Sequence, residues 1–431
     1  MTDPFTLSLV LIVALSVCGL SIGVAMICGS TVYLMLKGFD ASIAAETLLQ
    51  GLFNGYTLLA IPLFILAADI MNIGSLADRL LRFCEALVGR FRGGLGHVNV
   101  VSSVIFSGMS GSAVADAVGM GRIIINMMTK DGRYTKSYAA AITAATATVG
   151  PIIPPSIPMV LYALVADQSV GYLFAAGMAP GLLMAALMAL TNTIVARRRD
   201  FPVDDNIPLN ELPGITVRAT PALLLPVILL GGIYSGIVTP TEAAALAAFY
   251  ALSISVLLYR SVSFAQFFAT LLNSSRSTAT VGILIAGALT FNYVITRENV
   301  PNTLADFLSQ FELSRVGFLI AINVLILALG CVLEGGAILL IVVPIFIPTA
   351  QALGIDMVHF GVVSVVNMMI GLVTPPYGLL LFIVANITGE PMSRIVRDLV
   401  PFLIALFASL GVITFFPDFV LFLPRMLGYQ G

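Results

Sequence analysis

Long apolar runs recur along the whole chain, and they restrict the possible fold more than any other feature of the sequence. Two examples are LSLVLIVALSVCGLSIGVAM (7–26) and VGFLIAINVLILALGCVL (316–333). A helix needs roughly 20 apolar residues to cross the hydrocarbon core of a bilayer. Charged residues make up only 10% of the 431 residues, against about 25% in soluble domains. The sequence therefore predicts an all-α polytopic membrane protein.

The charged and metal-ligating residues argue against several function classes. The formal net charge is −2 and the longest basic tract is 197–199, so we expect no nucleic-acid partner. The four cysteines are scattered without a C-x-x-C pair, which predicts neither a disulfide framework nor a zinc site. The chain has two histidines, no H-E-x-x-H and no Walker A motif, so we expect no enzyme, no transition metal and no ATP-driven pump. Turnover without transport would favour an enzyme, and a steady conductance would favour a passive channel.

Two apolar runs are too long for a single crossing and contain small residues near their middle. The run 93–128 contains SGMSGSA (107–113), and the run 315–351 contains LEGGA (333–337). Such a cluster predicts a helical hairpin that enters and leaves on the same side of the membrane. The run 5–36 fits either one long tilted span, retained because it lacks a signal-peptide pattern, or two short pieces. The eleven predicted hydrophobic elements lie near 5–36, 52–71, 93–128, 138–166, 171–196, 219–236, 240–259, 278–296, 315–351, 358–388 and 399–423.

Prolines interrupt a helix-like run in each half of the chain. TVGPIIPPSIPMVLYA (148–163) has four prolines, and a proline in a helix interior costs roughly 3 kcal/mol. Within it, Pro154-Pro155 lines up with Pro375-Pro376 of IGLVTPPYGLLLFIVANI (370–387). Upstream, SGSA (110–113) lines up with EGGA (334–337) at nearly the same separation. Interrupted helices at matching places in two halves point to the binding site of a transporter.

Lys and Arg residues flank the first predicted hairpin more densely than the second. Cytoplasmic loops carry the excess of Lys and Arg. We therefore expect the first hairpin to open from the cytoplasm and the second from the far side, as in an inverted repeat. The side of the N-terminus stays open. The first hairpin is flanked by Arg79, Arg82, Arg90, Arg92, Lys130, Arg133 and Lys136, and the second by Arg297 and Arg315.

Helix breaks inside a membrane free backbone groups that lipid cannot satisfy, at a cost of several kcal/mol each. Such groups are tolerated when they are buried in protein or when they line a water-filled site. Freed carbonyls suit a hard cation such as sodium, and half-helix N-termini favour anions. We therefore interpret the prolines as holding backbone open for ions and substrate, against the alternative that each is a structural kink.

Six motifs resemble the large membrane subunit of tripartite ATP-independent periplasmic (TRAP) transporters, and the resemblance covers essentially the whole chain. They are AIPLFILAADIM (60–71), GRFRGGLGHVNVVSSVIFSGMSGSAVADAVGMG (89–121), GPIIPPSIP (150–158), AGMAPGLL (176–183), TPTEAAA (239–245) and IGLVTPPYG (370–378).

The resemblance implies two inverted repeats, each with a re-entrant hairpin and a proline-broken helix, and an elevator that carries an organic acid into the cell with sodium. The acid would be a C4-dicarboxylate, sialic acid or a similar carboxylate. It also implies a bacterial inner-membrane location, a separate small four-helix membrane subunit and a periplasmic substrate-binding protein. A sodium- or proton-coupled carboxylate carrier of the same plan that works without a binding protein is the alternative.

The resemblance also implies site residues at the hairpin tips and helix breaks, with sodium held by main-chain carbonyls and hydroxyls and with substrate between the tips. The implied sodium ligands are Ser107, Gly108, Ser110, Gly111, Ser112, Thr148, Val149, Gly150, Gly335, Gly336, Gly371 and Thr374. The implied substrate-binding residues are Ser112, Pro154, Pro155, Ser156, Glu334, Thr374, Pro375 and Pro376.

Ionisable residues inside predicted spans are functional candidates by default. Asp116 is expected to pair with Arg122 or to meet polar neighbours, with a functional and a structural role equally open. Glu334 is expected to coordinate or gate. Glu242 is expected to cap a helix start and Asp69 to lie at the membrane interface. His97 and His359 are interpreted as structural, and Arg79, Arg82, Arg90 and Arg92 as one solvated face of an arm helix.

The predicted organisation is a rigid scaffold of outer spans and arm helices around a mobile transport domain of hairpins and broken helices. The predicted segments are scaffold spans 1–73, arm helix 74–92, first transport half 93–196, cytoplasmic linker 197–218, scaffold spans 219–299, second arm helix 300–312, second transport half 313–390 and C-terminal span 391–431.

Overall fold

Helices are the only regular elements longer than an isolated bridge in the part of the chain that the structure describes. That part of the computed structural model is residues 3–431 without 74–75, 202, 204–206, 209 and 311–313. Parts of both predicted arm segments and of the predicted linker 197–218 therefore lie outside the described residues. Seven of the described helices are long and apolar enough to cross a membrane. The prediction of an all-α membrane protein is confirmed.

The N-terminal apolar run forms two short helices, which decides between the two predicted alternatives. Helix α1 (Pro4–Val17) ends before Gly19, and α2 (Ile22–Leu36) packs back against α1. The Ser8 hydroxyl donates a hydrogen bond to the Gly29 carbonyl at 3.0 Å, and both residues are buried in the α1–α2 contact. Helix α3 (Ser42–Asn54) follows, and a short 3₁₀ turn then leads into α4 (Ala60–Ile73).

The predicted reversal inside the run 93–128 is observed. After the amphipathic helix α5 (Leu76–Val88), helix α6 (Gly94–Ser110) ends at Gly111, which has a φ of +62°. The chain then reverses, and α8 packs against α6. We call the turn at 110–112 the first tip. The returning helices are α7 (Ala113–Val118) and α8 (Met120–Thr129).

The first proline-rich segment breaks a helix into two pieces as predicted. Helix α9 (Lys136–Ala147) stops before the prolines, and α10 (Ile157–Ala166) starts after them. The segment between them, residues 148–156, is the first break. All its residues are buried, and the Pro154–Pro155 peptide bond is cis.

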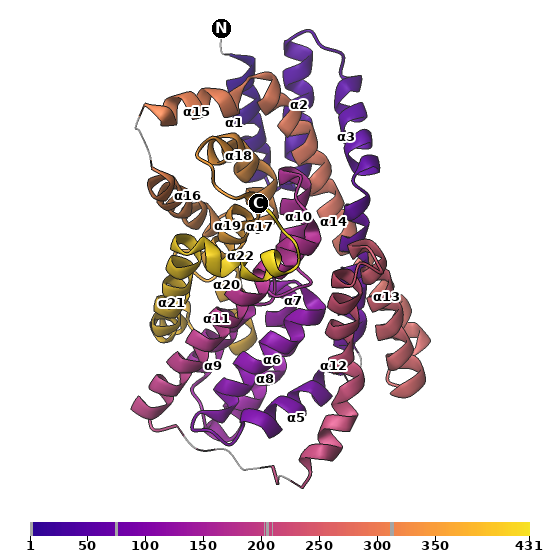
Figure 1. Ribbon diagram of the computed structural model, residues 1–431, viewed down its shortest axis with the longest axis vertical. Helices are drawn as coiled ribbons and strands as arrows, with labels where there is room; N and C mark the ends of the chain where they lie inside the picture. Colours follow the sequence, from indigo (N-terminus) through magenta and orange to yellow (C-terminus); the bar gives the residue numbers. More distant parts are fainter. Residues whose placement is uncertain (1–2, 74–75, 202, 204–206, 209, 311–313) are drawn as a thin grey trace.

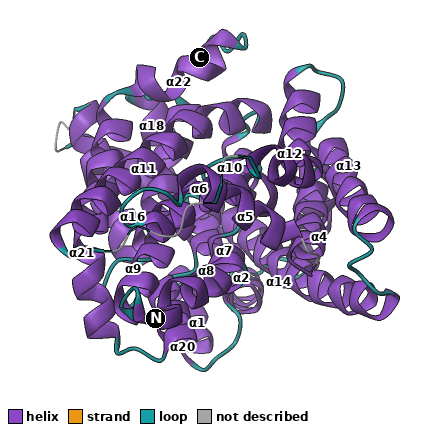
Figure 2. Ribbon diagram, turned by 90° about the horizontal axis from the view of Figure 1, so that it is seen from below, coloured by secondary structure: helices purple, strands orange, loops and turns teal. Residues whose placement is uncertain are grey.

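Four long helices connect the two halves. They are α11 (Val170–Arg198), α12 (Leu212–Tyr234), α13 (Pro240–Ser253, continued by a π-helical turn to Leu258) and α14 (Phe264–Arg297). Seen from below, α4, α12, α13 and α14 lie on one side (Figure 2). On the other side lie α11, α16 (Arg315–Gly330) and α21 (Met392–Phe415), and α6, α7 and α10 lie between the two groups.

The second half repeats the same sequence of elements. Helix α15 (Val300–Ser309) precedes α16 (Arg315–Gly330), and residues 331–336 form the second tip. The second break is residues 372–378, with a cis Pro375–Pro376 bond. The first hairpin lies in the lower part of Figure 1 and the second in the upper part. The remaining helices are α17 (Gly335–Ala337), continued by a π-helical turn into α18 (Val343–Ala352), α19 (Met357–Gly371), α20 (Leu379–Thr388), α21 (Met392–Phe415) and α22 (Pro417–Met426).

Each half contains a matching polar contact between its hairpin and its broken helix. The Thr146 hydroxyl donates to Asn99 Oδ1 at 2.8 Å, and the Asn367 amide donates to Asn323 Oδ1 at 2.6 Å. The two contacts occupy equivalent positions in the halves. Asn99 and Asn323 each lie 11 residues before the matching tip residue, Ser110 or Glu334. Thr146 and Asn367 each lie 8 residues before the first proline of the Pro-Pro pair in their half. Equivalent positions in the two halves therefore make equivalent contacts.

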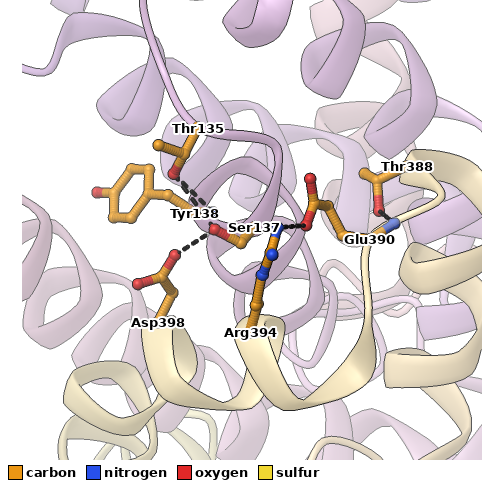
Figure 3. A network of polar contacts seen from close by, with 7 residues as sticks. All are labelled: Thr135, Ser137, Tyr138, Thr388, Glu390, Arg394 and Asp398. Atoms are coloured by element: carbon orange, nitrogen blue, oxygen red, sulfur yellow. Dashed lines mark hydrogen bonds and ion pairs between the residues drawn. The ribbon is translucent and has the colours of Figure 1, made fainter.

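A polar network fixes helix α21 to the start of α9 (Figure 3). The Ser137 hydroxyl donates to Asp398 Oδ2 at 2.6 Å, and Arg199, just past the end of α11, donates to Oδ1 at 2.6 Å. Arg394, in the first turn of α21, pairs at 3.4 Å with Glu390, which lies just before that helix. Asp398 is buried, so the network ties three helices at one end of the molecule.

Candidate functional site

A central cavity of about 480 Å³ lies where the two tips meet. Its wall includes the first tip and the start of α7 (residues 110–115), residues 334–336 of the second tip, and parts of both broken helices around Leu161 and Met368. The opposite side of the wall comes from α4 and α14. The volume lies within the range of roughly 300–1,000 Å³ typical of small-molecule sites.

The first tip is held against the first break by close backbone contact. A Cβ atom added at Gly111 would lie 2.6 Å from the Pro155 carbonyl oxygen, so only glycine fits there. Ser112 caps α7, because its hydroxyl accepts a hydrogen bond from the Ala115 N–H at 3.3 Å. The Ser110 hydroxyl donates to Asp116 Oδ1 at 2.5 Å.

The second tip and second break are joined in the same way. The Gly378 N–H donates to the Cys331 carbonyl at 3.3 Å. A Cβ atom at Gly371 would lie 2.8 Å from the backbone of Gly330, which places the end of α16 directly against the break. In each half the tip and the break therefore present backbone to one another without an intervening side chain.

The structure divides the predicted site residues into those that line the central cavity and those that do not. Ser110, Gly111, Ser112, Glu334, Gly335 and Gly336 line the central cavity. Among the predicted residues outside the wall, three hydroxyls donate hydrogen bonds to backbone carbonyls nearby in the chain: Ser107 to Val104, Thr148 to Ala145 and Thr374 to Ile370. The predicted residues that do not line the cavity are Ser107, Gly108, Thr148, Val149, Gly150, Pro154, Pro155, Ser156, Gly371, Thr374, Pro375 and Pro376.

The two breaks differ in exposure. The prolines and Ser156 of the first break are buried, and the Ser156 hydroxyl donates to the Pro151 carbonyl and caps α10. In the second break, Thr374 and Pro375 are half-buried and Pro376 is exposed. The matched sequences thus occupy unequal surroundings.

The structure corrects the prediction for Asp69. It does not lie at an outer surface, because it lines the central cavity and Ser274 donates to its Oδ2 at 2.6 Å. Ser277, also in the wall, was missed. The sequence shows an acidic residue, Asp69, inside an apolar run, which marks it as a candidate. Whether the Asp69 side chain faces the cavity depends on how α4 packs against α14.

The other ionisable residues follow the predictions more closely. Asp116 does not pair with Arg122, which is exposed, and it meets the polar neighbour Ser110 instead. Glu242 forms a capping box with Thr239 at the start of α13, as predicted. His359 is buried and its ring bonds the Ile413 carbonyl at 2.9 Å, which fits a structural role.

The described wall of the central cavity carries acidic groups and no basic ones. Asp69 and Glu334 are its two carboxylates, and none of the described lining residues is Lys, Arg or His. The serine hydroxyls and the glycine backbone of the tips supply the remaining polar surface. Such a wall suits cations directly, and it suits an anion only when cations are already bound.

Comparison with known proteins shows the family. Residues 9–419 match the family model of the tripartite ATP-independent periplasmic transporter, DctM component. The chain is 38% identical over 413 residues to the sialic acid TRAP transporter large permease protein SiaM of Vibrio cholerae, covering 95% of this chain and 96% of that protein. It is 42% identical to the C4-dicarboxylate TRAP transporter large permease protein DctM of Pseudomonas aeruginosa, covering 86% and 87%. It is 37% identical to the 2,3-diketo-L-gulonate TRAP transporter large permease protein YiaN of Escherichia coli, covering 92% and 93%.

Two solved structures share the fold. The Alcanivorax borkumensis YdaH transporter superposes with a TM-score of 0.63 at 15% identity, over 85% of this chain and 86% of that one. Neisseria gonorrhoeae MtrF, from a class of antimetabolite efflux pumps, gives 0.57 at 11% identity, over 85% and 84%. A family match over nearly the whole chain, relatives at these identities and seven apolar helices establish that this chain belongs to the DctM family of TRAP transporter large permease subunits and is a multi-pass protein of the bacterial inner membrane.

Proposed function

We propose that the chain carries a carboxylate into the cell together with sodium, by moving the two hairpins and broken helices as one body against the outer helices. The central cavity between the two tips carries this proposal, because it is the place where both halves contribute backbone and hydroxyl groups to one small-molecule site. The tips and breaks would form the moving body, and α4, α12, α13 and α14 the fixed one.

The matched halves support an inverted repeat with two re-entrant hairpins. The equivalent Asn99–Thr146 and Asn323–Asn367 contacts favour a common ancestral unit. The hairpins lie toward opposite ends of the molecule in Figure 1, and the Lys and Arg excess lies at the first. An inverted repeat gives a transporter two nearly equivalent conformations, one open to each side.

Backbone contact between tip and break supports a cation site in each half. The Gly111–Pro155 and Gly330–Gly371 approaches bring backbone groups, including the Pro155 and Gly330 carbonyls, close to the facing segment, and no side chain separates them. Hard cations prefer such oxygen ligands. Sodium would therefore bind among the tip and break residues of both halves, including Ser112 and Thr374.

The charge of the cavity supports binding of sodium before the carboxylate. Two acids and no described basic residue would repel an anion from an empty site. The three relatives are named for transport of sialic acid, C4-dicarboxylates and 2,3-diketo-L-gulonate, all of which are carboxylates at neutral pH. Bound sodium ions would supply the positive charge that the wall lacks, and this makes uptake of a carboxylate obligatorily sodium-dependent.

The family's tripartite plan supports two protein partners. We propose that a small four-helix membrane subunit covers part of the outer face and that a periplasmic binding protein delivers the substrate. The outer faces of α12 and α13 carry exposed apolar side chains such as Val227 and Phe249, which require lipid or an apolar partner helix. Uptake by this chain and its small subunit without a binding protein would favour the alternative, a self-sufficient carboxylate carrier.

A melting experiment tests the sodium sites without substrate or partner. The purified chain is heated in sodium chloride and in choline chloride at equal ionic strength. A ligand that binds only the folded state stabilises it by about 2.7 kcal/mol at a hundredfold excess over Kd. We expect a saturable, sodium-selective rise in melting temperature. Equal melting temperatures in the two salts would contradict sodium coupling.

Uptake by two variants tests the assignment of the sites. Ser112→Leu and Thr374→Leu place a bulky apolar side chain at a tip and at a break, and we expect both to abolish sodium-dependent uptake while membrane insertion persists. Thr220→Leu, at an exposed position of α12, is the matched control and should transport normally. Unimpaired uptake in both site variants would remove these residues from the site.

A further inference from the structure

A second, much smaller cavity lies under the first hairpin and shares no lining residue with the central cavity. Its volume is about 10 Å³, close to the smallest cavity that holds one water molecule, roughly 10–15 Å³. Its polar lining comes from Asn99 and Ser103 on α6, Asp116 on α7 and Thr143 on α9. The hairpin therefore contains a space for a single particle, bordered on one part of its wall by these four oxygen-bearing side chains and on the rest by apolar residues such as Phe106 and Ile124.

Asp116 lines this cavity and carries an unsatisfied oxygen. The residue is 4% exposed, and its Oδ1 accepts the hydrogen bond from Ser110. Its Oδ2 is buried and has no hydrogen-bond partner within the described residues. A Cβ atom at Gly150 would lie 2.0 Å from Oδ2, so this oxygen rests on the backbone of the first break.

A bound cation accounts for this arrangement better than a proton does. An isolated buried carboxylate is strongly unfavourable unless it is neutralised or paired. A proton on Oδ2 would need an acceptor, and Oδ2 has no hydrogen-bond partner among the described residues. A cation, in contrast, uses the free space, and its preferred ligands are the carboxylate, hydroxyl and amide oxygens that border it.

We infer that Asp116, Ser103, Thr143 and Asn99 form a binding site for one dehydrated sodium ion, separate from the tip-and-break sites. This inference rests on the proposed sodium coupling and adds an ion to it. The two halves of the chain are offset by 224 positions at the tips, as Ser110 and Glu334 show. At the same offset, the second half has the buried apolar Leu340 in place of Asp116, so the site belongs to the first half.

The ion would act on the central cavity through Ser110. This side chain lines the central cavity and donates to Asp116 Oδ1, and Asp116 also lines the smaller cavity. Sodium on Oδ2 would keep Asp116 ionised and therefore keep Oδ1 an acceptor for Ser110. The occupancy of the buried site would thus fix the first tip in the shape that receives substrate.

Direct sodium counting tests the site. The purified full-length chain in detergent is titrated with ²²Na⁺ at constant ionic strength, and the number of ions bound per chain is measured for the wild type, Asp116→Asn and Asp167→Asn. Asp167 is exposed, so its variant controls for loss of one negative charge. We expect Asp116→Asn to bind one ion fewer than the wild type and Asp167→Asn to bind the same number.

Melting temperatures in choline chloride show whether the Asp116→Asn variant is folded. Without sodium it should melt at or above the wild-type temperature, because it no longer buries an uncompensated carboxylate. If it does not fold, Ser103→Ala replaces it. That variant keeps the charge and should lose roughly tenfold in affinity for one of the ions, and an unchanged isotherm would refute the site.

The outcomes separate this site from the proposed function. Equal sodium counts for the wild type and Asp116→Asn overturn the inference and leave the tip-and-break sites standing. Equal counts together with a pH-dependent melting temperature that Asp116→Asn abolishes identify Asp116 as a proton holder, which also overturns it. No sodium bound to the wild type would refute the sodium coupling itself along with this site.

Discussion

Gly111 offers the sharpest test of the contact between the first tip and the first break. Replacing it with alanine adds one methyl group at a residue with a φ of +62°, in the left-handed region. A non-glycine residue there costs about 1–2 kcal/mol. The new Cβ would also lie 2.6 Å from the Pro155 carbonyl oxygen, and such overpacking typically costs about 1–3 kcal/mol. The variant should therefore lose about 2–5 kcal/mol of stability.

Gly389 is the matched control for the backbone term. It has a φ of +69° at the end of α20, and an added Cβ meets nothing within 4 Å. Gly389→Ala should therefore lose only the conformational part, about 1–2 kcal/mol. The assay is thermal unfolding of both purified variants beside the wild type, followed by sodium-dependent uptake. Gly111→Ala should melt well below Gly389→Ala and lose uptake.

The comparison has a clear negative result. If the two glycine variants melt at the same temperature and both transport, the tip does not press on the break and the cation site between them loses its geometric basis. A loss of uptake in Gly111→Ala without a lower melting temperature would instead show that the break moves aside at little cost. In that case the contact between the tip and the break matters for transport, but it contributes less to stability than the estimate above.

Two further predictions concern charged pairs outside the cavity. Asp398→Ala should lower stability by about 1–3 kcal/mol, which is less than the 3–5 kcal/mol of a fully buried pair because the Arg199 side chain is 37% exposed. Asp418→Ala breaks the exposed pair with Arg425 and should cost under about 1 kcal/mol in the same melting assay. Equal losses in the two variants would refute the structural role of the Asp398 network. The hydrogen bond from Lys37 and then that from Tyr33 lower the pKa of the Glu298 carboxyl in the folded protein. The ionised carboxylate therefore contributes its full stabilisation at a pH above the pKa of the carboxyl in the unfolded chain, and this contribution disappears as the pH falls through the pKa in the folded protein. Glu298→Gln should therefore melt below the wild type at neutral pH and converge with it in acid, and a constant difference across a pH series would contradict this linkage.

The sequence by itself determined the class of protein and the order of its elements. Apolar runs require a membrane, and the proline clusters at 151–158 and 375–376 must end helices wherever the chain folds, since they remove backbone donors and clash with the preceding turn. The reversal at Gly111 and the capping box at Thr239 and Glu242 are equally local. Each of these features depends on a few consecutive residues, so reading along the chain was enough to find them.

Only the tertiary structure decided which residues face the central cavity. Asp69 appeared to lie at the membrane interface, yet its contact with Ser274, 205 residues away, turns it into the wall. Predicted ligands such as Thr148 and Ser156 do not line the cavity, and their hydroxyls donate to backbone carbonyls nearby in the chain. The partner of Asp116 and the space beside it depend on α6, α7 and α9 meeting at one point. The direction of each side chain is set by packing between helices that are distant in the sequence, and the hydropathy of a helix does not indicate which other helix packs against it.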